Sequence, residues 1–519
     1  MSVPPEHRIM TDHTKSKAAR HKPAPAQVLT HAEVKAVVGG IAMAMFLGAL
    51  DQTIIATALP TIGRHFNDVE NLSWVVTAYL LTGTAVTPLY GKLSDNYGRR
   101  IMMLIGVGIF VAGSIACAMA PNMLALIIAR ALQGLGGGGL MALAQTIIAD
   151  IVTPRERGRY QGYISAVFAV SSVGGPVLGG FLTEHIDWSF IFWINLPLGL
   201  IAFVTCFIVL RRVPYRPRRH RLDLIGAVLM MLGSVPLLLA LTWGGRHFEW
   251  ISAPIGGLLL ASALSWALFG WRLVATPEPF LPLSVLGNPI VRCAALSGAC
   301  TMGAMVGLTI FVPLYFEVVM QLSASQSGLA LIPLMAGTVT ASTVAGKAMM
   351  HVTHYKRMGL AGLIEAIVAL AALAIWPGSM PVALVIVLFA VIGLGMGLVF
   401  PIATVSMQNV VAAQQMGVAT GASNFFRSLF SSVVVALLGA IVLSGLGGAG
   451  ANVAVEQLAH AASGHDLVLA FRFVFMAVAL VLAFGLCFMI SLEEKPLRGP
   501  AAEHPVLETG APASRTPPQ

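Results

Sequence analysis

Charged residues are scarce in this chain of 519 residues: Asp, Glu, Lys and Arg together make up 10%, whereas hydrophobic residues make up 57%. Soluble globular proteins carry roughly a quarter charged residues, so the composition excludes that class and indicates a polytopic membrane protein. Residues 1–34 are polar and basic and have neither an apolar core nor a small-residue cleavage site. We therefore expect a cytoplasmic tail there and no cleavable signal peptide.

Other chemical signatures are missing as well. The five cysteines lie in or beside apolar segments and form neither a CxxC pair nor a Cys/His cluster, which argues against disulfides and zinc. The P-loop pattern GxxxxGK[ST] is absent, because Gly346-Lys347 is followed by Ala348, so ATP is not the expected energy source. No catalytic arrangement stands out, and the net charge of +9 is spread over loops. We expect no enzyme activity, no cofactor and no nucleic-acid partner.

Long apolar runs fill most of the chain. Each is long enough for a membrane-spanning helix of about 20 residues, and backbone that faces lipid over such a length must be helical. The sequence predicts an all-α membrane protein with about fourteen spans, near residues 36–59, 72–91, 101–119, 122–149, 160–181, 189–210, 222–243, 252–272, 290–318, 326–346, 358–376, 380–402, 416–446 and 467–491.

The distribution of Lys and Arg predicts the orientation of these spans. Loops on one side carry basic clusters around residues 92–100, 155–159 and 211–221, whereas the loops on the other side carry only Arg64 and Arg246. An excess of Lys and Arg marks the cytoplasmic side of a membrane protein. Both termini are therefore expected on the cytoplasmic side.

The second group of long spans repeats sequence features of the first. The glycine-rich run from Gly134 to Asp150 matches the run from Gly393 to Asn409, and the same offset aligns Gly158 with Gly417. Gly91-Lys92 likewise has a counterpart in Gly346-Lys347, but this second copy lacks an acid equivalent to Asp95. Two six-helix halves related by such a repeat are typical of secondary transporters, whose substrate site lies between the halves.

The repeat also sets the expected domain boundaries, because the spans at 222–243 and 252–272 have no partner in it. The predicted order is a disordered cytoplasmic tail (1–34), an N-terminal six-helix half (35–211), a basic linker with two inserted transmembrane helices (212–288), a C-terminal six-helix half (289–492) and a second disordered cytoplasmic tail (493–519).

Four motifs resemble those of the major facilitator superfamily, and specifically of its fourteen-span drug:proton antiporter family. Gly91–Arg100, GKLSDNYGRR, resembles the signature between helices 2 and 3. Leu50–Pro60 resembles the first-helix motif and Arg130–Gly134 the fourth-helix motif. Gly174–Gly180 resembles the fifth-helix motif that is associated with antiporters rather than symporters. The resemblance covers nearly all of residues 36–491 and implies the major facilitator fold and a multidrug exporter in a bacterial cytoplasmic (inner) membrane.

Asp51 is the most informative single residue. A carboxylate inside an apolar span costs about 3 kcal/mol and is normally functional or paired. Burial makes it a candidate for binding and releasing a proton near neutral pH. The alternative is a structural partner for a buried arginine, of which Arg130 and Arg427 are available within spans. The family resemblance gives Arg130 a part in proton movement.

Further candidates fall into three sets. Two other carboxylates within spans, Glu317 and Glu365, either join the proton pathway or sit solvated near the span ends. Amide, aromatic and basic side chains toward the middle of the spans are candidates for lining a permissive cavity: Tyr79, Gln145, Asn195, Phe425, Phe426 and Arg427. The resemblance implies a conformational latch on the cytoplasmic face, formed by Gly91, Asp95, Gly98, Arg99, Arg100 and Asp150.

The fifth-helix motif has a physical interpretation of its own. Gly174, Gly175, Pro176, Gly179 and Gly180 place small or kinking residues at five of seven positions, so another helix can approach closely. A generic close helix crossing would need the same residues. The resemblance implies that this crossing seals the outward side and favours export.

The predicted function is export of drugs or other amphipathic compounds in exchange for protons, with coupling at Asp51. Two alternatives remain open at this point: a proton-coupled uptake symporter for a metabolite on the same fold, and a membrane scaffold or sensor without transport. The expected partners are small amphipathic substrates, protons and the lipid bilayer. Some relatives dock onto a periplasmic adaptor protein, and the sequence leaves open whether this chain does.

Overall fold

The computed structural model describes residues 30–68, 71–213, 223–245, 247–445 and 464–497. The regular secondary structure of these residues is helical, apart from one isolated bridge between Gly244 and Phe248. The predicted tails therefore lie almost wholly outside the described residues.

The first half contains α1 (His31–Phe66), α2 (Leu72–Tyr97), α3 (Arg99–Ala118), α4 (Met123–Gly137), α5 (Leu140–Ile151), α6 (Pro154–His185), α7 (Phe190–Trp193) and α8 (Asn195–Val209). The inserted segment contains α9 (Leu224–Trp243), α10 (Ala253–Ala275) and the short α11 (Leu283–Leu286). The second half contains α12 (Pro289–Val318), α13 (Ala324–Ala330), α14 (Ile332–Ala348), α15 (Lys356–Ile375), α16 (Val382–Val410), α17 (Met416–Gly445) and α19 (Gly464–Ser491).

The prediction of an all-α membrane protein is confirmed. Thirteen helical segments within the described residues are long and apolar enough to cross a membrane. The helix α2 is a fourteenth of membrane length, with 26 residues, although its polar C-terminal part lowers its hydropathy. It packs between α4 and α17.

Two predicted boundaries shift in an informative way. The span predicted at 122–149 is divided into α4 and α5 by a break at Gly138 and Gly139, where the Gly138 carbonyl accepts the Thr87 hydroxyl of α2 at 2.7 Å. The stretch Gly91–Arg100, expected as a short loop, is helical as far as Tyr97. The chain reverses at Gly98 alone, whose φ of +96° suits a residue without a Cβ.

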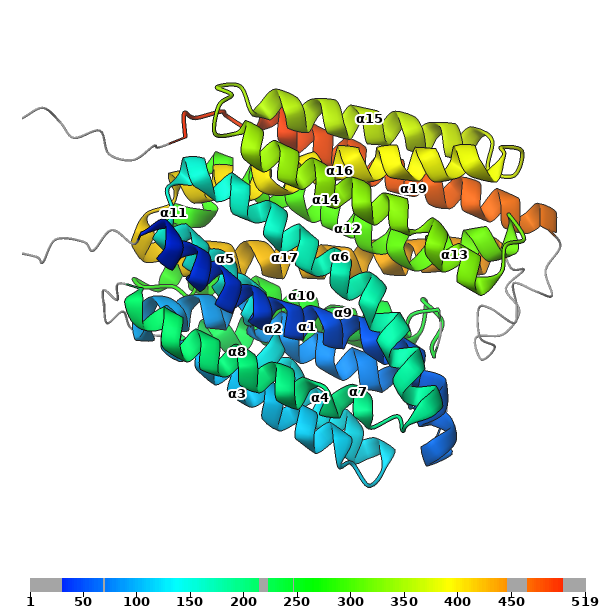
Figure 1. Ribbon diagram of the computed structural model, residues 1–519, viewed down its shortest axis with the longest axis horizontal. Coiled ribbons are helices and arrows are strands. Elements are labelled where there is room, and N and C mark those ends of the chain that lie inside the picture. Colours follow the sequence, from blue (N-terminus) through cyan, green and yellow to red (C-terminus); the bar gives the residue numbers. More distant parts are fainter. Residues whose placement is uncertain (1–29, 69–70, 214–222, 246, 446–463, 498–519) are drawn as a thin grey trace, which may run out of the picture.

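The halves form two helix groups (Figure 1) that meet at α2–α17 and α6–α14. The start of α1 and the end of the described chain lie at the same end of the molecule, on the left of Figure 1. We call it the terminal end. At the opposite end the outer parts of α1 and α6 diverge from α13 and α19 (Figure 1). The two halves are therefore in close contact at the terminal end, and their helices diverge toward the opposite end.

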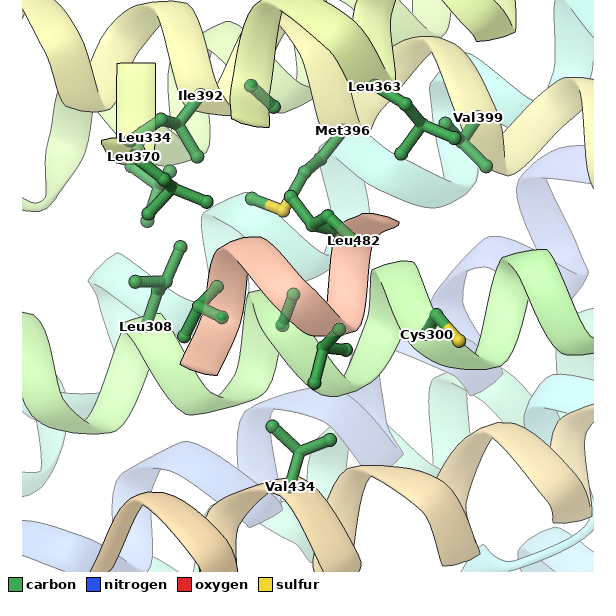
Figure 2. Close-up of a cluster of buried hydrophobic side chains, with 14 of the residues drawn as sticks. Cys300, Leu308, Leu334, Leu363, Leu370, Ile392, Met396, Val399, Val434 and Leu482 are labelled. Atoms are coloured by element: carbon green, nitrogen blue, oxygen red, sulfur yellow. The ribbon is translucent and has the colours of Figure 1, made fainter. Parts of the chain in front are cut away.

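Close packing of apolar side chains holds each half together. Figure 2 shows this in the second half, where Leu308 of α12, Met396 of α16 and Leu482 of α19 lie in one buried cluster with Leu334, Leu363, Leu370, Ile392 and Val434. Lipid tails are as apolar as these side chains, so dispersion contacts rather than exclusion from water favour the packed state.

The inserted helices lie along the α2–α17 seam. The helix α9 packs on α10, α2 and α17, Trp243 stacks edge-on against Trp74 at 5.4 Å, and Trp266 contacts Phe425 at 6.1 Å. Asp223 fixes the hairpin at the terminal end. Its carboxylate accepts Arg272 Nε at 2.7 Å and the backbone N–H groups of Gly226 and Phe280.

Candidate functional site

Asp51 lies in the middle of α1 and is 1% exposed. Its Oδ2 accepts Arg130 Nη1 at 2.7 Å, and its Oδ1 accepts the side-chain amides of Gln133 at 2.8 Å and Asn195 at 3.0 Å. Ser114 joins the group by accepting from both amides. One carboxylate thus connects α1, α3, α4 and α8 within the first half. We call these five residues the Asp51 network.

Arg130 is held from several sides. Its Nε donates to the Val75 carbonyl of α2 at 3.0 Å, and its guanidinium lies 4.4 Å from the centre of the Tyr79 ring. Such a cation–π contact stabilises a desolvated guanidinium. Adding a proton to Asp51 would remove the charge that pairs with Arg130. A change in the charge of Asp51 would therefore disturb the contacts of the whole network.

The structure places two of the predicted cavity residues in these buried surroundings. Tyr79 is 3% exposed and Asn195 is fully buried, so in this conformation they contact charged groups of the first half. Sequence reasoning did not single out Gln133 and Ser114. Gln133 lies three residues after Arg130 on α4, a spacing that puts both on one helix face and could have identified it. No signal in the sequence marks Ser114.

The fifth-helix motif packs α6 against α1. A Cβ added at Gly175 or Gly179 would overlap Thr53 and Thr57 of α1, respectively, and the Thr53 hydroxyl donates to the Ser171 carbonyl at 2.7 Å. Gly174 and Gly180 have open space around them, and Pro176 is exposed. Thr53 follows Asp51 by two residues, so a shift at this crossing moves the Asp51 backbone.

A second cluster of charges lies at the terminal end and crosses between the halves. Arg99 pairs with Asp95 at 2.6 Å and with Asp150 at 2.8 Å. The Asp95 carboxylate also accepts the backbone N–H groups of Gly417 at 3.1 Å and Val418 at 3.0 Å. These groups belong to the first turn of α17, where the helix dipole favours a negative charge. Asp95 therefore fastens α2 to the start of α17.

Two glycine pairs bring the halves together beside this cluster. A Cβ at Gly91 of α2 would meet the backbone of Gly417 of α17, and a Cβ at Gly346 of α14 would meet the backbone of Gly158 of α6. Gly346 is the repeat counterpart of Gly91, and Gly158 that of Gly417. The two contacts are thus copies of one crossing, which only residues without a side chain can form.

The second crossing has no acid in the Asp95 position, as the sequence indicated. Arginines at the start of α6 replace it with bonds to carbonyl groups of the second half: Arg155 Nε donates to Met350 at 2.6 Å and Arg157 Nη1 donates to Gln408 at 3.2 Å. Arg100, grouped with the latch in the sequence, lies instead over the Phe207 ring of α8 at 4.6 Å.

The middle of the α17 seam is polar. Asn424 donates to Gln145 of α5 at 2.8 Å, and Ser428 shares a hydrogen bond with Thr84 of α2 at 2.9 Å. Phe425 is fully buried against Trp266, and Phe426 is partly buried beside it. Gln145 and Phe425 are therefore covered by helix contacts in this conformation.

Arg427 points into the second half. It is 8% exposed, Nη2 donates to the Thr404 hydroxyl at 3.0 Å, and Nε has no hydrogen-bond partner within the described part of the chain. The guanidinium packs on Gly298 of α12, where a Cβ would lie 2.9 Å from Nη2. A buried cation with so few acceptors is costly, which makes Arg427 a candidate functional residue.

Replacing Arg427 by methionine is therefore expected to raise the free energy of unfolding by about 1–3 kcal/mol, because it removes a buried and poorly paired charge. Transport should fall in the same variant. Denaturant titration of the purified protein measures the first effect. The control is Arg472→Met, which removes an exposed arginine bound to the Ala374 and Ile375 carbonyls. A loss of stability in Arg427→Met would show that this guanidinium has a structural role.

The other two predicted carboxylates lie outside the Asp51 network. Glu317 is partly buried near the end of α12, and Glu365 is exposed on α15. Among the residues that the structure describes, no group of three or more His, Cys, Asp or Glu side chains could hold a metal ion.

Comparison with known proteins connects these sites to a family. Residues 41–436 match the family model described as Major Facilitator Superfamily. The "Multidrug transporter protein MdtP" of Bacillus subtilis (strain 168) is 35% identical over 408 residues, which cover 78% of this chain and 75% of the relative. The "Multidrug resistance protein 3" of the same organism is 31% identical over 412 residues, covering 79% and 80%.

A fungal protein and a solved structure extend the comparison. The "Multidrug resistance protein fnx1" of Schizosaccharomyces pombe (strain 972 / ATCC 24843) is 32% identical over 413 residues, covering 77% of each chain. The crystal structure of the human organic anion transporter MFSD10 (TETRAN) matches with a TM-score of 0.61 over 86% of this chain and 99% of that one, at 15% identity, a likeness that concerns the fold alone. This chain belongs to the major facilitator superfamily of membrane transporters.

Proposed function

We propose that this chain is a proton-coupled antiporter that exports drugs or other amphipathic compounds across the cytoplasmic membrane. The observation that carries the proposal is the Asp51 network, a buried carboxylate whose ion pair must change before it can take a proton. The names of the multidrug relatives supply the substrate class. The fifth-helix motif, which packs α6 on α1 beside Asp51, supports exchange over symport.

In the proposed coupling, the two halves of the protein move between two conformations. The basic residues at the terminal end support a cytoplasmic position for that end, and in the proposed cycle the conformation described here is the one closed on the cytoplasmic side. When Asp51 takes up a proton from outside, the ion pair between Asp51 and Arg130 weakens. The helix α1 can then move relative to α6. Cargo from the cytoplasm then binds the opposite state and favours loss of the proton, because the two ligands differ in affinity for the two states.

The test uses everted membrane vesicles from an efflux-deficient host, energised so that the lumen becomes acidic. Screening toxic compounds for growth protection first identifies a cargo. That cargo is expected to dissipate the pH gradient, and its accumulation in the lumen should stop when nigericin collapses the gradient. A cargo that moves equally well without any ion gradient would overturn proton coupling. Movement of the cargo out of the lumen together with protons would favour the uptake symporter.

A further inference from the structure

Two arginines share one aromatic ring at the terminal end of the first half, where α3 and α8 pack side by side. Arg100, in the first turn of α3, has its guanidinium carbon 4.6 Å from the centre of the Phe207 ring. Arg211, in the short 3₁₀ turn (Leu210–Arg212) that follows α8, lies 4.3 Å from the same centre. The separation of the two cations cannot exceed the sum of these distances, about one Debye length, so they repel each other. We call these three residues the Arg100 site.

Neither arginine of this site has a counter-charge in the described part of the chain. Arg100 Nε is buried without a hydrogen-bond partner, and neither guanidinium forms an ion pair with a described residue. Asp95 and Asp150, the carboxylates of the neighbouring cluster, are both bound to Arg99. Together with Arg100 and Arg211, this group of five residues carries one net positive charge. One negative charge from a bound molecule would balance it.

The surface around the Arg100 site is apolar and exposed. Ile101 follows Arg100 on α3 and is 52% exposed, and Ile208 follows Phe207 on α8 and is 58% exposed. Both helices belong to segments that are long and apolar enough to cross a membrane. Exposed apolar side chains of such helices contact lipid tails, whereas arginines at the helix ends reach the headgroup layer. A molecule with an acidic head and apolar tails would match both parts of this surface.

The sequence repeat provides an internal comparison. The counterparts of Arg99 and Arg100 in the second half are Lys356 and Arg357. Lys356 Nζ donates to the Ile490 carbonyl at 2.7 Å, and Arg357 is exposed, with no described aromatic ring beneath its guanidinium. A general attraction of basic residues to an anionic membrane surface would act at both positions. The paired and stacked arrangement at Phe207 therefore indicates a defined site in the first half.

We propose that the Arg100 site binds one phospholipid whose headgroup carries a single net negative charge, with its phosphate between Arg100 and Arg211. Its acyl chains lie along the exposed apolar surfaces of α3 and α8. Stacking on Phe207 holds the planes of both guanidinium groups, so their N–H edges are preorganised for phosphate oxygens. The bound lipid thereby ties the start of α3 to the end of α8. This binding does not depend on the proposed export function.

The test titrates the full-length protein in detergent with three probes and counts bound molecules by native mass spectrometry. The probes are phosphatidylglycerol, phosphatidylcholine, whose headgroup has no net charge, and glycerol 3-phosphate, which has no acyl chains. One phosphatidylglycerol is expected to bind at about 10-fold lower concentration than phosphatidylcholine, and glycerol 3-phosphate should not bind in that range. Equal binding of the two lipids, or no retained phosphatidylglycerol, would overturn the proposal. Equal binding of glycerol 3-phosphate would show a site for free phosphate instead.

Variants assign the bound lipid to the Arg100 site. Arg100→Gln with Arg211→Gln is expected to weaken phosphatidylglycerol binding by about 10- to 30-fold. The matched control, Arg292→Gln with Arg357→Gln, removes two exposed arginines from the starts of α12 and α15 and should leave binding unchanged. Should the first double variant fail to fold, Phe207→Leu provides a second criterion, because it keeps both charges but removes the stacking and should also weaken binding. Unchanged binding in the folded site variant, or an equal loss in the control, would refute the assignment.

Discussion

Replacing Asp51 by asparagine is expected to abolish proton-coupled export and to lower the free energy of unfolding by about 3–5 kcal/mol. The energetic effect follows from burial, because both Asp51 and Arg130 are 1% exposed and the substitution leaves the guanidinium without a counter-charge. Asparagine can keep one of the amide contacts, so the backbone of α1 should stay in place. Proton exchange in vesicles and denaturant unfolding measure the two effects separately.

A double substitution separates charge balance from coupling. Asp51→Asn with Arg130→Gln removes the unpaired cation, so most of the lost stability should return while proton exchange stays absent. The control is Glu365→Gln, which removes a carboxylate that lies exposed on α15. Normal proton exchange in Asp51→Asn would refute the role proposed for Asp51. Recovery of exchange in the double variant would show that the pair has a structural role only.

Asp95→Asn is expected to lower the turnover of export by about 10- to 100-fold with little change in the KM for the cargo. The carboxylate makes an ion pair to Arg99 and two hydrogen bonds to the start of α17, and hydrogen bonds to a charged group contribute about 1.5–3 kcal/mol. Losing this energy changes the equilibrium constant between the two conformations by about 10- to 100-fold. The predicted cavity residues, such as Gln145 and Phe425, are not changed by the substitution. Initial rates over a range of cargo concentrations measure both constants.

Asp150→Asn is the matched control for this experiment. Asp150 also pairs with Arg99, but its bond at 2.8 Å stays within the first half. Losing the ion pair to Asp150 leaves Arg99 less firmly held but removes no contact between the halves. The fall in turnover should therefore be much smaller than in Asp95→Asn. Equal effects of the two substitutions, or a large rise in KM for Asp95→Asn, would show that Asp95 does not control the conformational step.

The fold could be predicted from the sequence because apolar runs of membrane length and basic loops are local signals. The repeat could also be recognised in the sequence, because Gly91 has a counterpart in Gly346 and Gly158 has a counterpart in Gly417. The contacts of Gly91 with Gly417 and of Gly346 with Gly158 depend on how the two halves pack, and the sequence does not show that packing. The same limit applies to the Asp51 network, in which Asp51, Arg130 and Asn195 are far apart in the chain.

Side-chain direction was the other quantity that the sequence could not supply. Arg427 and Glu365 both lie within apolar spans, yet one is buried in the second half and the other is exposed. The helix α15 is apolar on most sides, so no polar stripe indicates where Glu365 points. Membrane helices carry weaker face signals than helices in water, because lipid and protein interior are both apolar.

The position of α9 and α10 makes the two lateral sides of the carrier unequal. These helices pack along α2 and α17, whereas α6 and α14 cross on the other side of the molecule, at the front in Figure 1. A hydrophobic compound dissolved in the bilayer thus meets a hairpin in front of one seam and the bare helix surfaces of the other. Among the described helices, the α9–α10 hairpin thus covers the α2–α17 seam but not the α6–α14 seam.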